Sequence, residues 1–243
     1  MLNPAIKKLL MAFFVTRITH DYLVGLYRRY LFISRCRLLQ RVGPSILADV
    51  HRALSSMGIQ YFADYGTLLG IIREKGFIKH DDDIDFSIPV GAVTPERLMR
   101  AIDRIGDFSF AHAFASKGKI SELSYHCRGV QVDFFFLEEL GGKTYAVDYL
   151  EPEGNYELFQ DPWPKRRQER CVAQGLHEVR LGDIITVIPT NYEQILTMTY
   201  GDWKTPMKGW KGQVDSGQRP YEMNGDLGMM LNAHQTRELV GLA

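Results

Sequence analysis

Hydrophobic residues recur at helical spacing through the first part of the chain. Between residues 4 and 33 they return every three or four positions, which predicts one or two amphipathic helices. The sequence Gly43-Pro44-Ser45 predicts the start of another helix, because the fixed φ of proline suits the first helical turn. Helical spacing then continues to Gly58, a residue type that commonly follows the C-terminus of a helix.

The rest of the chain changes between short strand-like and short helical segments. Alternating polarity and β-branched or aromatic residues predict strands at residues 59–63, 83–89, 108–114, 120–127, 130–137, 143–149, 178–181 and 184–188. Helical spacing, with Thr or Asn as caps, predicts helices at residues 68–75, 94–105, 191–199 and 227–242. Stretches rich in proline, glycine and charge predict irregular loops at residues 151–170 and 202–227.

One predicted strand carries a row of acids. The stretch His80–Ile88 has the sequence HDDDIDFSI, and in a strand successive side chains point to opposite faces of the sheet. Asp81, Asp83 and Asp85 therefore share one face, while the other face is apolar. Neighbouring carboxylates repel one another, more strongly when they are buried, and a divalent cation removes that repulsion. We interpret Asp83 and Asp85 as metal ligands, with Mg²⁺ favoured because it prefers carboxylate and water oxygens.

A third acid stands within a strongly apolar strand, Val130–Leu137. Asp133 is the one charged residue of this stretch, and a buried charge is costly unless it is paired or bound to a metal. An isolated aspartate in such a strand can also lie at a sheet edge and face water. Because a strand with paired acids is already present, we expect Asp133 to complete the metal site.

The turn before the acidic strand is suited to phosphate. Gly66 and Thr67 lie between a predicted strand and a predicted helix, where glycine allows close approach to the backbone and the helix N-terminus offers free N–H groups. Arg73 and Lys79 follow and can neutralise phosphate charge, although solvation at the surface explains a single basic residue equally well. We take these four residues and Tyr65 as candidates for donor and phosphate binding.

Composition and charge narrow the function further. The 243 residues include 45% hydrophobic and 24% charged residues, as in an ordinary globular protein. Residues 1–52 hold nine Lys or Arg against two Asp or Glu, whereas the remainder holds 20 against 27. Because the basic region is confined to one end and no nucleic-acid-binding module is recognisable, we expect no nucleic-acid partner. Cys36, Cys127 and Cys171 form no C-x-x-C pair, so neither a disulfide framework nor a zinc site is indicated.

Two interpretations fit the basic N-terminal region. Its helix either lies on an anionic membrane surface through residues 1–35, with aromatic residues at the apolar boundary, or packs as an amphipathic helix on the domain. The longest apolar run, Leu9–Val15, is too short to span a bilayer and is not followed by a small-residue cleavage site. We therefore expect a cytoplasmic protein, free or peripheral on the inner membrane face.

The order of predicted elements resembles that of the nucleotidyltransferase superfamily, and more narrowly that of its LicD family, to which the fukutin-related proteins are also similar. The resemblance rests on three stretches: DYGTLLGIIREKGFIKHDDDIDFSI (Asp64–Ile88), VDFFFL (Val132–Leu137) and IPTNYEQILTMTYGDWKTP (Ile188–Pro206). The family's hydrophobic-aromatic pair before the acids is replaced here by Ile78-Lys79-His80, which leaves the acids intact, and the first 40 residues lie outside the resemblance.

The resemblance implies an α+β fold. A nucleotidyltransferase-like mixed β-sheet flanked by helices would form a catalytic domain over residues 43–243, preceded by a basic amphipathic helical extension over residues 1–42. The implied reaction moves a phosphorylated small group, such as phosphocholine or an alditol phosphate, from a CDP-linked donor to a hydroxyl of a cell-surface or lipid-linked glycan, and CMP leaves.

The chemistry of phosphoryl transfer suits the candidate residues. Two ions of Mg²⁺ or Mn²⁺ would share Asp83 and Asp85 as ligands and neutralise charge on the phosphate oxygens. Asp133 would complete the second metal site and accept the proton of the acceptor hydroxyl.

Five further residues have supporting roles in this prediction. Tyr200 and Trp203, in the sequence YGDW, would stack on the base or wall the donor pocket, although core packing is the simpler interpretation outside the family context. We expect Asp81 and Asp82 to act behind the metal ligands or to cap the turn. His80 either touches phosphate or serves as a turn residue.

Two other functions fit parts of the sequence. Transfer of a nucleotide to a small acceptor uses the same superfamily fold, but the three consecutive acids and the YGDW sequence favour phosphotransfer. A non-catalytic protein held on an anionic surface by its basic N-terminus would have no reason to keep three mutually repelling carboxylates.

Overall fold

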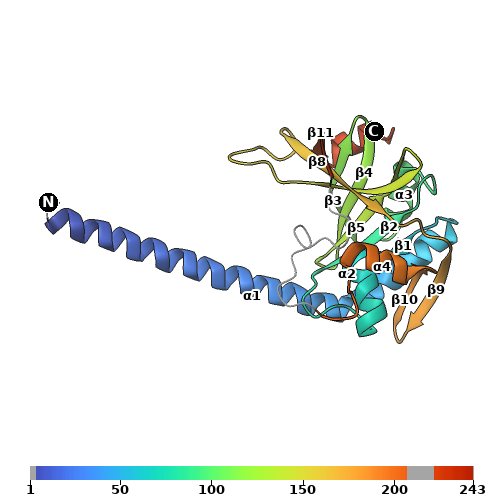
Figure 1. Ribbon diagram of the computed structural model, residues 1–243, viewed down its shortest axis with the longest axis horizontal. Helices are drawn as coiled ribbons and strands as arrows, with labels where there is room; N and C mark the ends of the chain where they lie inside the picture. The colour runs from blue at the N-terminus through green and yellow to red at the C-terminus, as the bar shows by residue number, and fades with distance from the viewer. Residues whose placement is uncertain (1–3, 207–221, 243) are drawn as a thin grey trace.

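The computed structural model describes residues 4–206 and 222–242, with side chains for residue 20, residues 22–206 and most of residues 222–242 (Figure 1). Its helices are α1 (Pro4–Ser56), α2 (Tyr65–Leu69), α3 (Pro95–Ile102), α4 (Tyr192–Tyr200) and α5 (Ala233–Leu239), with a π-helical turn η1 (Gly70–Glu74) after α2. Its strands are β1 (Phe62–Ala63), β2 (Asp83–Ile88), β3 (Phe108–Ser116), β4 (Lys119–Cys127), β5 (Val130–Phe136), β6 (Glu138–Leu140), β7 (Lys143–Tyr149), β8 (Pro162–Arg170), β9 (Leu176–Leu181), β10 (Ile184–Pro189) and β11 (Glu222–Leu231).

A curled sheet of nine strands holds most of these elements, in the order β1-β2-β5-β4-β3-β11-β8-β7-β6. Strands β2 and β5 are parallel and the other neighbours are antiparallel, so the sheet is mixed and the expected α+β class is confirmed. Strand β6 follows β5 almost at once in the chain, yet it lies at the far end of the strand order, which requires the sheet to bend back on itself. Strands β9 and β10 form a separate hairpin.

One face of β2 and β5 is packed under helices. Ile84 and Phe86 of β2 and Val132 and Phe134 of β5 are fully buried, and the two phenyl rings stack with their centroids 5.3 Å apart. Helix α1 packs against β5 and α3 on this side. Each such side chain contributes roughly 1.5–3 kcal/mol by burial, so this face is fixed and the intervening aspartates are held on the opposite face.

Helix α1 is continuous where the sequence predicted a new start. It passes through Gly43 and Pro44 without a break, so the expected start there is wrong, and the expected domain boundary after residue 42 falls inside the helix. Gly43 is required because a Cβ there would overlap the ring of Phe77. Pro44 removes a helical hydrogen bond at a cost of about 3 kcal/mol. Burial of Ile46 and Leu47, both 0% exposed, offsets that cost.

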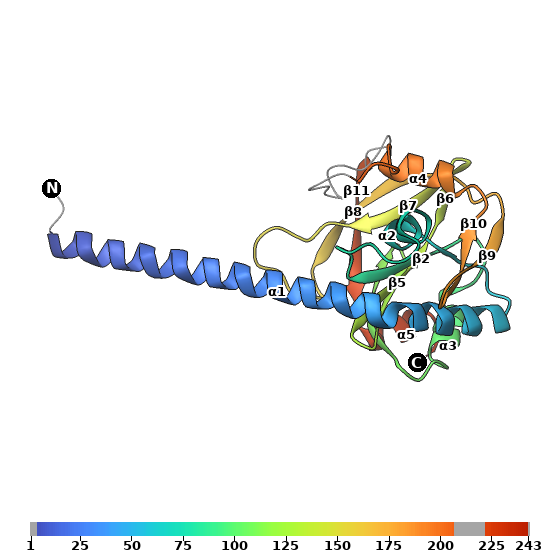
Figure 2. The same ribbon diagram turned by 90° about the horizontal axis from the view of Figure 1, so that it is seen from below.

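The two halves of α1 have different surroundings. The C-terminal half lies along the body, whereas the N-terminal half extends away from it as a rod (Figures 1 and 2). The apolar side chains within residues 22–33 are largely exposed, so packing on the domain is wrong for this segment, and the predictions for the side chains of residues 4–19 lie outside the described ones. Within the described residues, no helix has the length and hydropathy needed to cross a membrane.

Strand β8 lies where the sequence predicted a loop. Its charged residues pair with acids from other strands and from the turn before α2: Lys165 with Glu138, Arg166 with Asp148, Arg167 with Asp226, and Arg170 with Asp64. These pairs let a charged segment lie inside the curled sheet, which the composition alone does not reveal. The loop expected at residues 202–227 likewise ends in β11, and its residues 207–221 lie outside the described ones.

Candidate active site

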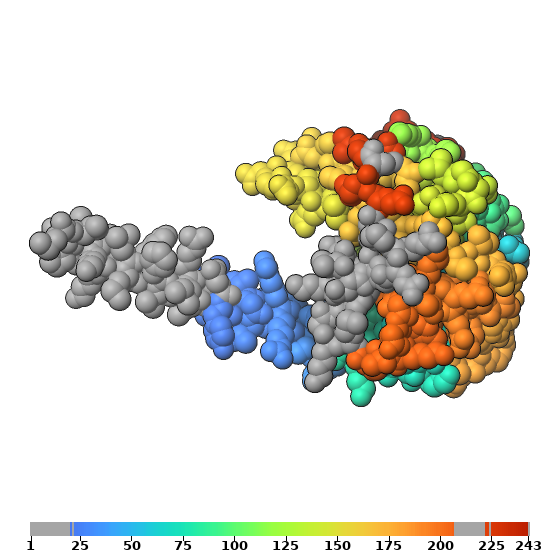
Figure 3. Space-filling view, in the orientation of Figure 1, coloured from blue at the N-terminus to red at the C-terminus, as the bar shows by residue number. Residues whose placement is uncertain are grey.

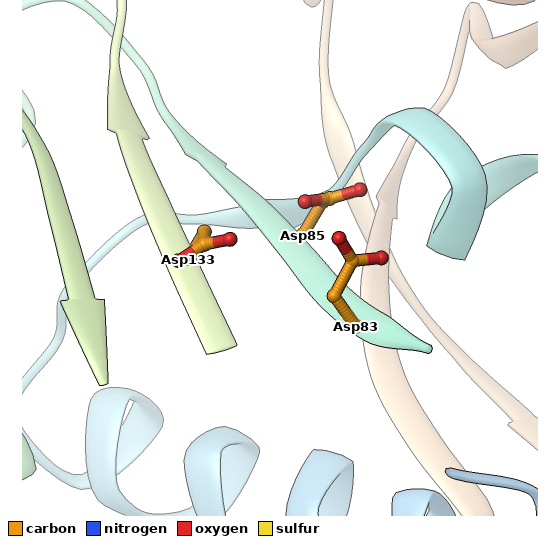
Figure 4. A group of neighbouring side chains, drawn as sticks. All are labelled: Asp83, Asp85 and Asp133. Atoms are coloured by element: carbon orange, nitrogen blue, oxygen red, sulfur yellow. The ribbon is translucent and has the colours of Figure 1, made fainter. Parts of the chain in front are cut away.

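Three carboxylates gather on one face of β2 and β5 (Figure 4). The two strands are parallel, and their register sets Asp85 opposite Asp133 and Asp83 opposite Gln131. One oxygen from each of the three aspartates lies within 4.8 Å of the others. The sequence therefore identified three acids that the fold brings together from segments about fifty residues apart.

Burial and mutual repulsion dominate the electrostatics of this cluster. Asp85 and Asp133 are 9% and 4% exposed. Burial, followed by the charge of Asp83, raises the pKa of Asp85 well above its ordinary value. Burial also raises the pKa of Asp83, and it raises the pKa of Asp133 to about 7. Without a counter-charge, burial and mutual repulsion therefore favour the protonated forms of these carboxyl groups.

The donor atoms of the cluster fit a hard divalent cation. Gln131 Nε2 donates to Asp133 Oδ2 at 2.9 Å, whereas Asp133 Oδ1 is buried with no hydrogen-bond partner among the described residues. A buried acceptor without a donor is costly. Carboxylate oxygens that face one another across a few ångströms are the ligands that Mg²⁺ and Mn²⁺ prefer.

Metal and pH are expected to act together on stability. The folded-state pKa of Asp133 is about 7 and that of Asp81 about 8, against an ordinary value of 3.8, so without metal the stability that these two groups contribute is lost as pH rises from about 4 to about 8. If the ionised carboxylates hold Mg²⁺, the ion should raise the melting temperature by several degrees at pH 8 and much less at pH 5.5. Calorimetry at the two pH values tests this, and equal shifts at both would contradict it.

Asp81 and Asp82 have different surroundings although they are adjacent. Asp81 shares a hydrogen bond with Asp83, and burial followed by the charge of Asp83 raises the pKa of Asp81 to about 8. Asp81 Oδ2 lies against Gly66, where a Cβ would overlap the carboxylate. Asp82 instead pairs with Arg35 of α1 at 2.6 Å. The glycine at the start of α2 therefore makes room for an acid beside the cluster.

Gly66→Ala is expected to disturb the cluster without unfolding the chain. The new methyl group displaces the Asp81 carboxylate, which hydrogen-bonds to Asp83. Loss of such a supporting partner typically lowers metal affinity by about 10–100-fold. Titration with Mn²⁺ measures the change. Gly76→Ala is the matched control, since a Cβ there meets nothing within 4 Å, and equal affinities of the two variants would contradict the role of Gly66.

A cavity of about 670 Å³ reaches Asp81, the acid next to the cluster, although Asp83, Asp85 and Asp133 are not among its described lining residues. Seven of the residues predicted from the sequence line it: Gly66, Arg73, Lys79, His80, Asp81, Tyr200 and Trp203. Phe32 of α1 lies in the same wall. Two basic side chains, a tyrosine and an acid of the predicted set thus face one space, which suits a charged ligand with an aromatic group.

Two residues predicted to bind phosphate lie elsewhere. Thr67 is fully buried, and its Oγ1 accepts a hydrogen bond from the backbone N–H of Asp85 at 3.0 Å, so it fixes α2 to β2. Tyr65 does not line the cavity: its ring packs edge-on against Phe135, and the Arg170 guanidinium lies 4.5 Å from the ring centroid.

The aromatic pair of the YGDW sequence is largely packed. Trp203 is 7% exposed, its Nε1–H donates to Thr197, and its backbone carbonyl accepts from Arg73 at 3.1 Å. Burial, with Asp85 next in effect, raises the pKa of Tyr200 above its ordinary value, so its hydroxyl stays protonated. Trp203 and Tyr200 both line the cavity, and Tyr200 is close enough to Asp85 to be affected by its charge.

Asp64 and Arg170 form a buried ion pair that the sequence did not reveal. Asp64 is 1% exposed; it caps α2 through the N–H of Tyr65, accepts a hydrogen bond from Ser87, and pairs with Arg170 at 2.6 Å. Burial lowers the pKa of Arg170, but the charges of Asp64 and Tyr65 and the hydrogen bonding to Asp64 together outweigh this, so the net shift is upward. The two residues are 106 positions apart, and no spacing rule connects them.

Glu122 of β4 is a fourth acid on the face of the cluster. It is 7% exposed, Ser124 Oγ donates to it at 2.9 Å, and burial followed by the charge of Asp133 raises its pKa well above the ordinary value. A signal existed in the sequence: polar residues at 122, 124 and 126 alternate with apolar residues at 123, 125 and 127. That alternation, combined with the β4–β5 pairing, places Glu122 on the side of Asp133.

Comparison with known proteins gives a family match over the centre of the chain. The family described as LicD/FKTN/FKRP, nucleotidyltransferase domain, matches residues 58–170. The mouse protein named ribitol-5-phosphate transferase FKTN is 24% identical over 179 residues, which is 71% of this chain and 35% of that protein. Uncharacterized proteins of Rickettsia typhi and Rickettsia prowazekii are 31% identical over 88 residues and 42% over 43 residues, covering 33% and 18% of this chain. The chain spans 28%, 16% and 35% of the lengths of the R. typhi, R. prowazekii and mouse proteins.

Proposed function

Because the chain belongs to the LicD family through residues 58–170, we propose that it is a metal-dependent phosphotransferase acting on glycans. The phosphorylated group is an alditol phosphate or phosphocholine, its donor is CDP-linked, and the acceptor is a hydroxyl of a cell-surface or lipid-linked glycan. The observation that carries the proposal is the gathering of one oxygen each from Asp83, Asp85 and Asp133 within 4.8 Å of one another. The neighbouring Asp81 lines a cavity together with two basic side chains.

Side chains around the cavity suit a nucleoside diphosphate. Arg73 forms an ion pair with Glu74 and donates a hydrogen bond to the carbonyl of Trp203. These two contacts fix its guanidinium at the cavity wall. Lys79 is exposed on the same wall and can follow a phosphate as it enters. Tyr200 lines the same cavity and offers an aromatic surface and a neutral hydroxyl.

Asp83, Asp85 and Asp133 would hold Mg²⁺ or Mn²⁺, two ions in the arrangement that the sequence predicts. The metal, when bound, neutralises charge on the phosphate oxygens of the donor and of the product. The fit rests on the unpartnered Asp133 Oδ1 and on the raised pKa values of all three acids, which lose their protons most readily beside a cation.

The transfer itself needs a proton acceptor and a fixed donor. The acceptor oxygen forms a bond to the β-phosphorus, the bond from that phosphorus to the bridging oxygen breaks, and CMP leaves with the electron pair. Asp133 accepts the proton of the acceptor hydroxyl, since it lies on the strand next to Asp85 and one of its oxygens has no hydrogen-bond donor within the described residues. Arg73 and Lys79 balance the charge of the departing CMP.

The proposal is tested by offering CDP-ribitol, CDP-glycerol and CDP-choline with Mg²⁺ and a glycolipid extract as acceptor, while free CMP is measured. CDP-ribitol comes first because of the name of the mouse relative. We expect CMP from one donor, and none after addition of EDTA. Nucleotide transfer would instead leave CMP attached to the acceptor and release the alditol phosphate. The proposal would be overturned if none of the three donors were turned over and the protein did not bind CDP.

A further inference from the structure

The N-terminal half of α1 carries an exposed apolar and aromatic surface. Between residues 22 and 33 the following side chains are more than one-third exposed: Tyr22, Leu23, Leu26, Tyr27, Tyr30, Leu31 and Ile33. The three tyrosines are each at least 62% exposed. At about 3.6 residues per turn these seven positions fall on one side of the helix. We call this set the tyrosine face.

The tyrosine face is turned away from the rest of the protein. The same helix packs on the body through Cys36, Leu39, Leu47 and Val50, all at most 4% exposed. By helical spacing these residues lie on the side opposite the tyrosine face. In the space-filling view the described blue segment after residue 19 stands clear of the body (Figure 3). Packing among the described residues therefore leaves a large apolar surface exposed.

Arginines accompany the tyrosine face in a stretch of sequence that lacks acids. The sequence from residue 22 to residue 48 contains five arginines and no Asp or Glu. Arg28 and Arg29 border the face, and within the described part of the chain neither they nor Arg37 or Arg41 form an ion pair with a carboxylate. Just beyond the face, a surface hollow of about 400 Å³ is lined by Ser34, Arg35, Arg37, Leu38 and Arg41.

We propose that the tyrosine face docks on an anionic phospholipid surface. Tyrosine and leucine suit the boundary between head groups and acyl chains, and arginines beside them meet the lipid phosphates. The hollow lined by Arg37 and Arg41 comes directly after the tyrosine face along the helix. The acyl chains of an anionic lipid would therefore meet the apolar side chains, and its phosphate would meet the arginines. A second copy of the chain is disfavoured as the occupant. Its five arginines in this segment would lie close to the five arginines of the first copy, and the like charges would repel one another.

The docking helix is joined to the cavity wall. Arg35 pairs with Asp82, next to the acidic cluster, and Gln40 donates to the carbonyls of Phe77 and Ile78. Phe32 lines the cavity itself. Resting on the proposed function, this connection would hold the cavity at the lipid surface, where the head group of a lipid-linked acceptor is found.

Co-sedimentation of the full chain with lipid vesicles tests the docking without any use of activity. We expect binding to vesicles of phosphatidylcholine with phosphatidylglycerol to be at least about tenfold stronger than binding to phosphatidylcholine alone, and to weaken as salt rises from 0.1 to 0.5 M. Tyr22→Ser/Leu26→Ser/Tyr30→Ser should weaken it by about tenfold or more, and Arg37→Gln/Arg41→Gln should remove most of its salt dependence.

Matched controls distinguish binding through the tyrosine face from non-specific hydrophobic binding to vesicles. Leu140→Ser/Leu158→Ser removes two side chains of similar exposure elsewhere and should leave vesicle binding unchanged. Asp83→Asn/Asp85→Asn should also bind vesicles normally, so failure of the catalytic proposal and failure of docking are distinguishable. Equal sedimentation of the triple variant and the unaltered chain would overturn docking. So would light scattering that shows a dimer dissociated by the triple substitution, since the face would then bind a second copy.

Discussion

Asp85→Asn is expected to reduce transfer by more than about 100-fold. Asp85 lies between Asp83 on its own strand and Asp133 on the neighbouring one, so it contributes to the cluster whichever oxygens bind a metal. Loss of a residue that only supports a metal ligand typically costs about 10–100-fold in affinity or activity, and loss of a ligand should exceed that. Release of CMP at saturating Mg²⁺ measures the effect.

The same substitution should not unfold the protein. Asparagine has the size of aspartate, and removing one of several repelling carboxylates relieves the burial and charge that raise the pKa of Asp85. Without metal, Asp85→Asn should therefore melt no lower than the unaltered chain. Asp103→Asn is the control, because Asp103 pairs with Arg237 at the surface and should keep full activity. An active Asp85→Asn variant would exclude the metal-ligand role.

Arg170→Met is expected to lower the free energy of unfolding by about 3–5 kcal/mol, the usual effect of removing one partner of a buried ion pair. The Arg170 and Asp64 side chains are 3% and 1% exposed, and two oxygens of the carboxylate lie 2.6 and 2.7 Å from one guanidinium nitrogen. The substitution leaves Asp64 charged and buried with Ser87 and the N–H of Tyr65 as its remaining partners. Urea denaturation followed by circular dichroism gives the difference.

A second substitution distinguishes charge from packing. Asp64→Asn in the Arg170→Met background removes the unpaired charge and should recover part of the stability. Arg180→Gln is the surface control: Arg180 pairs with Glu178 but is 65% exposed, so its loss should cost less than about 1 kcal/mol. If Arg170→Met and Arg180→Gln had the same small effect, the Asp64–Arg170 pair would not hold α2 against β8.

The acids could be predicted from the sequence because their signal is local. Alternation between aspartates and the apolar residues at 84, 86 and 88 fixes one face of β2, and Asp133 stands out in an apolar strand. Their approach then follows from the pairing of β2 with β5, in register at Asp85 and Asp133. Glu122 has a comparable alternating signal, but only the pairing of β4 with β5 shows that it faces the same site.

Other features depend on partners that are distant in the sequence. The charges and prolines of residues 162–170 are typical of a loop, and they lie in a strand because acids from β6, β7, β11 and the turn before α2 neutralise them. The start predicted at Pro44 is overridden because α1 buries a full side against the body on both sides of that residue. Thr67 fits a phosphate loop by sequence, yet its hydroxyl accepts from Asp85.

Binding of Mn²⁺, followed by the loss of its free-ion electron paramagnetic resonance signal, tests the central claim most directly. The gathering of Asp83, Asp85 and Asp133 predicts saturable binding to the unaltered chain, strengthened by CDP and lost in Asp85→Asn/Asp133→Asn. The same variant should remain folded by circular dichroism. Mn²⁺ binding of equal affinity and stoichiometry in the unaltered chain and in this variant would contradict the account.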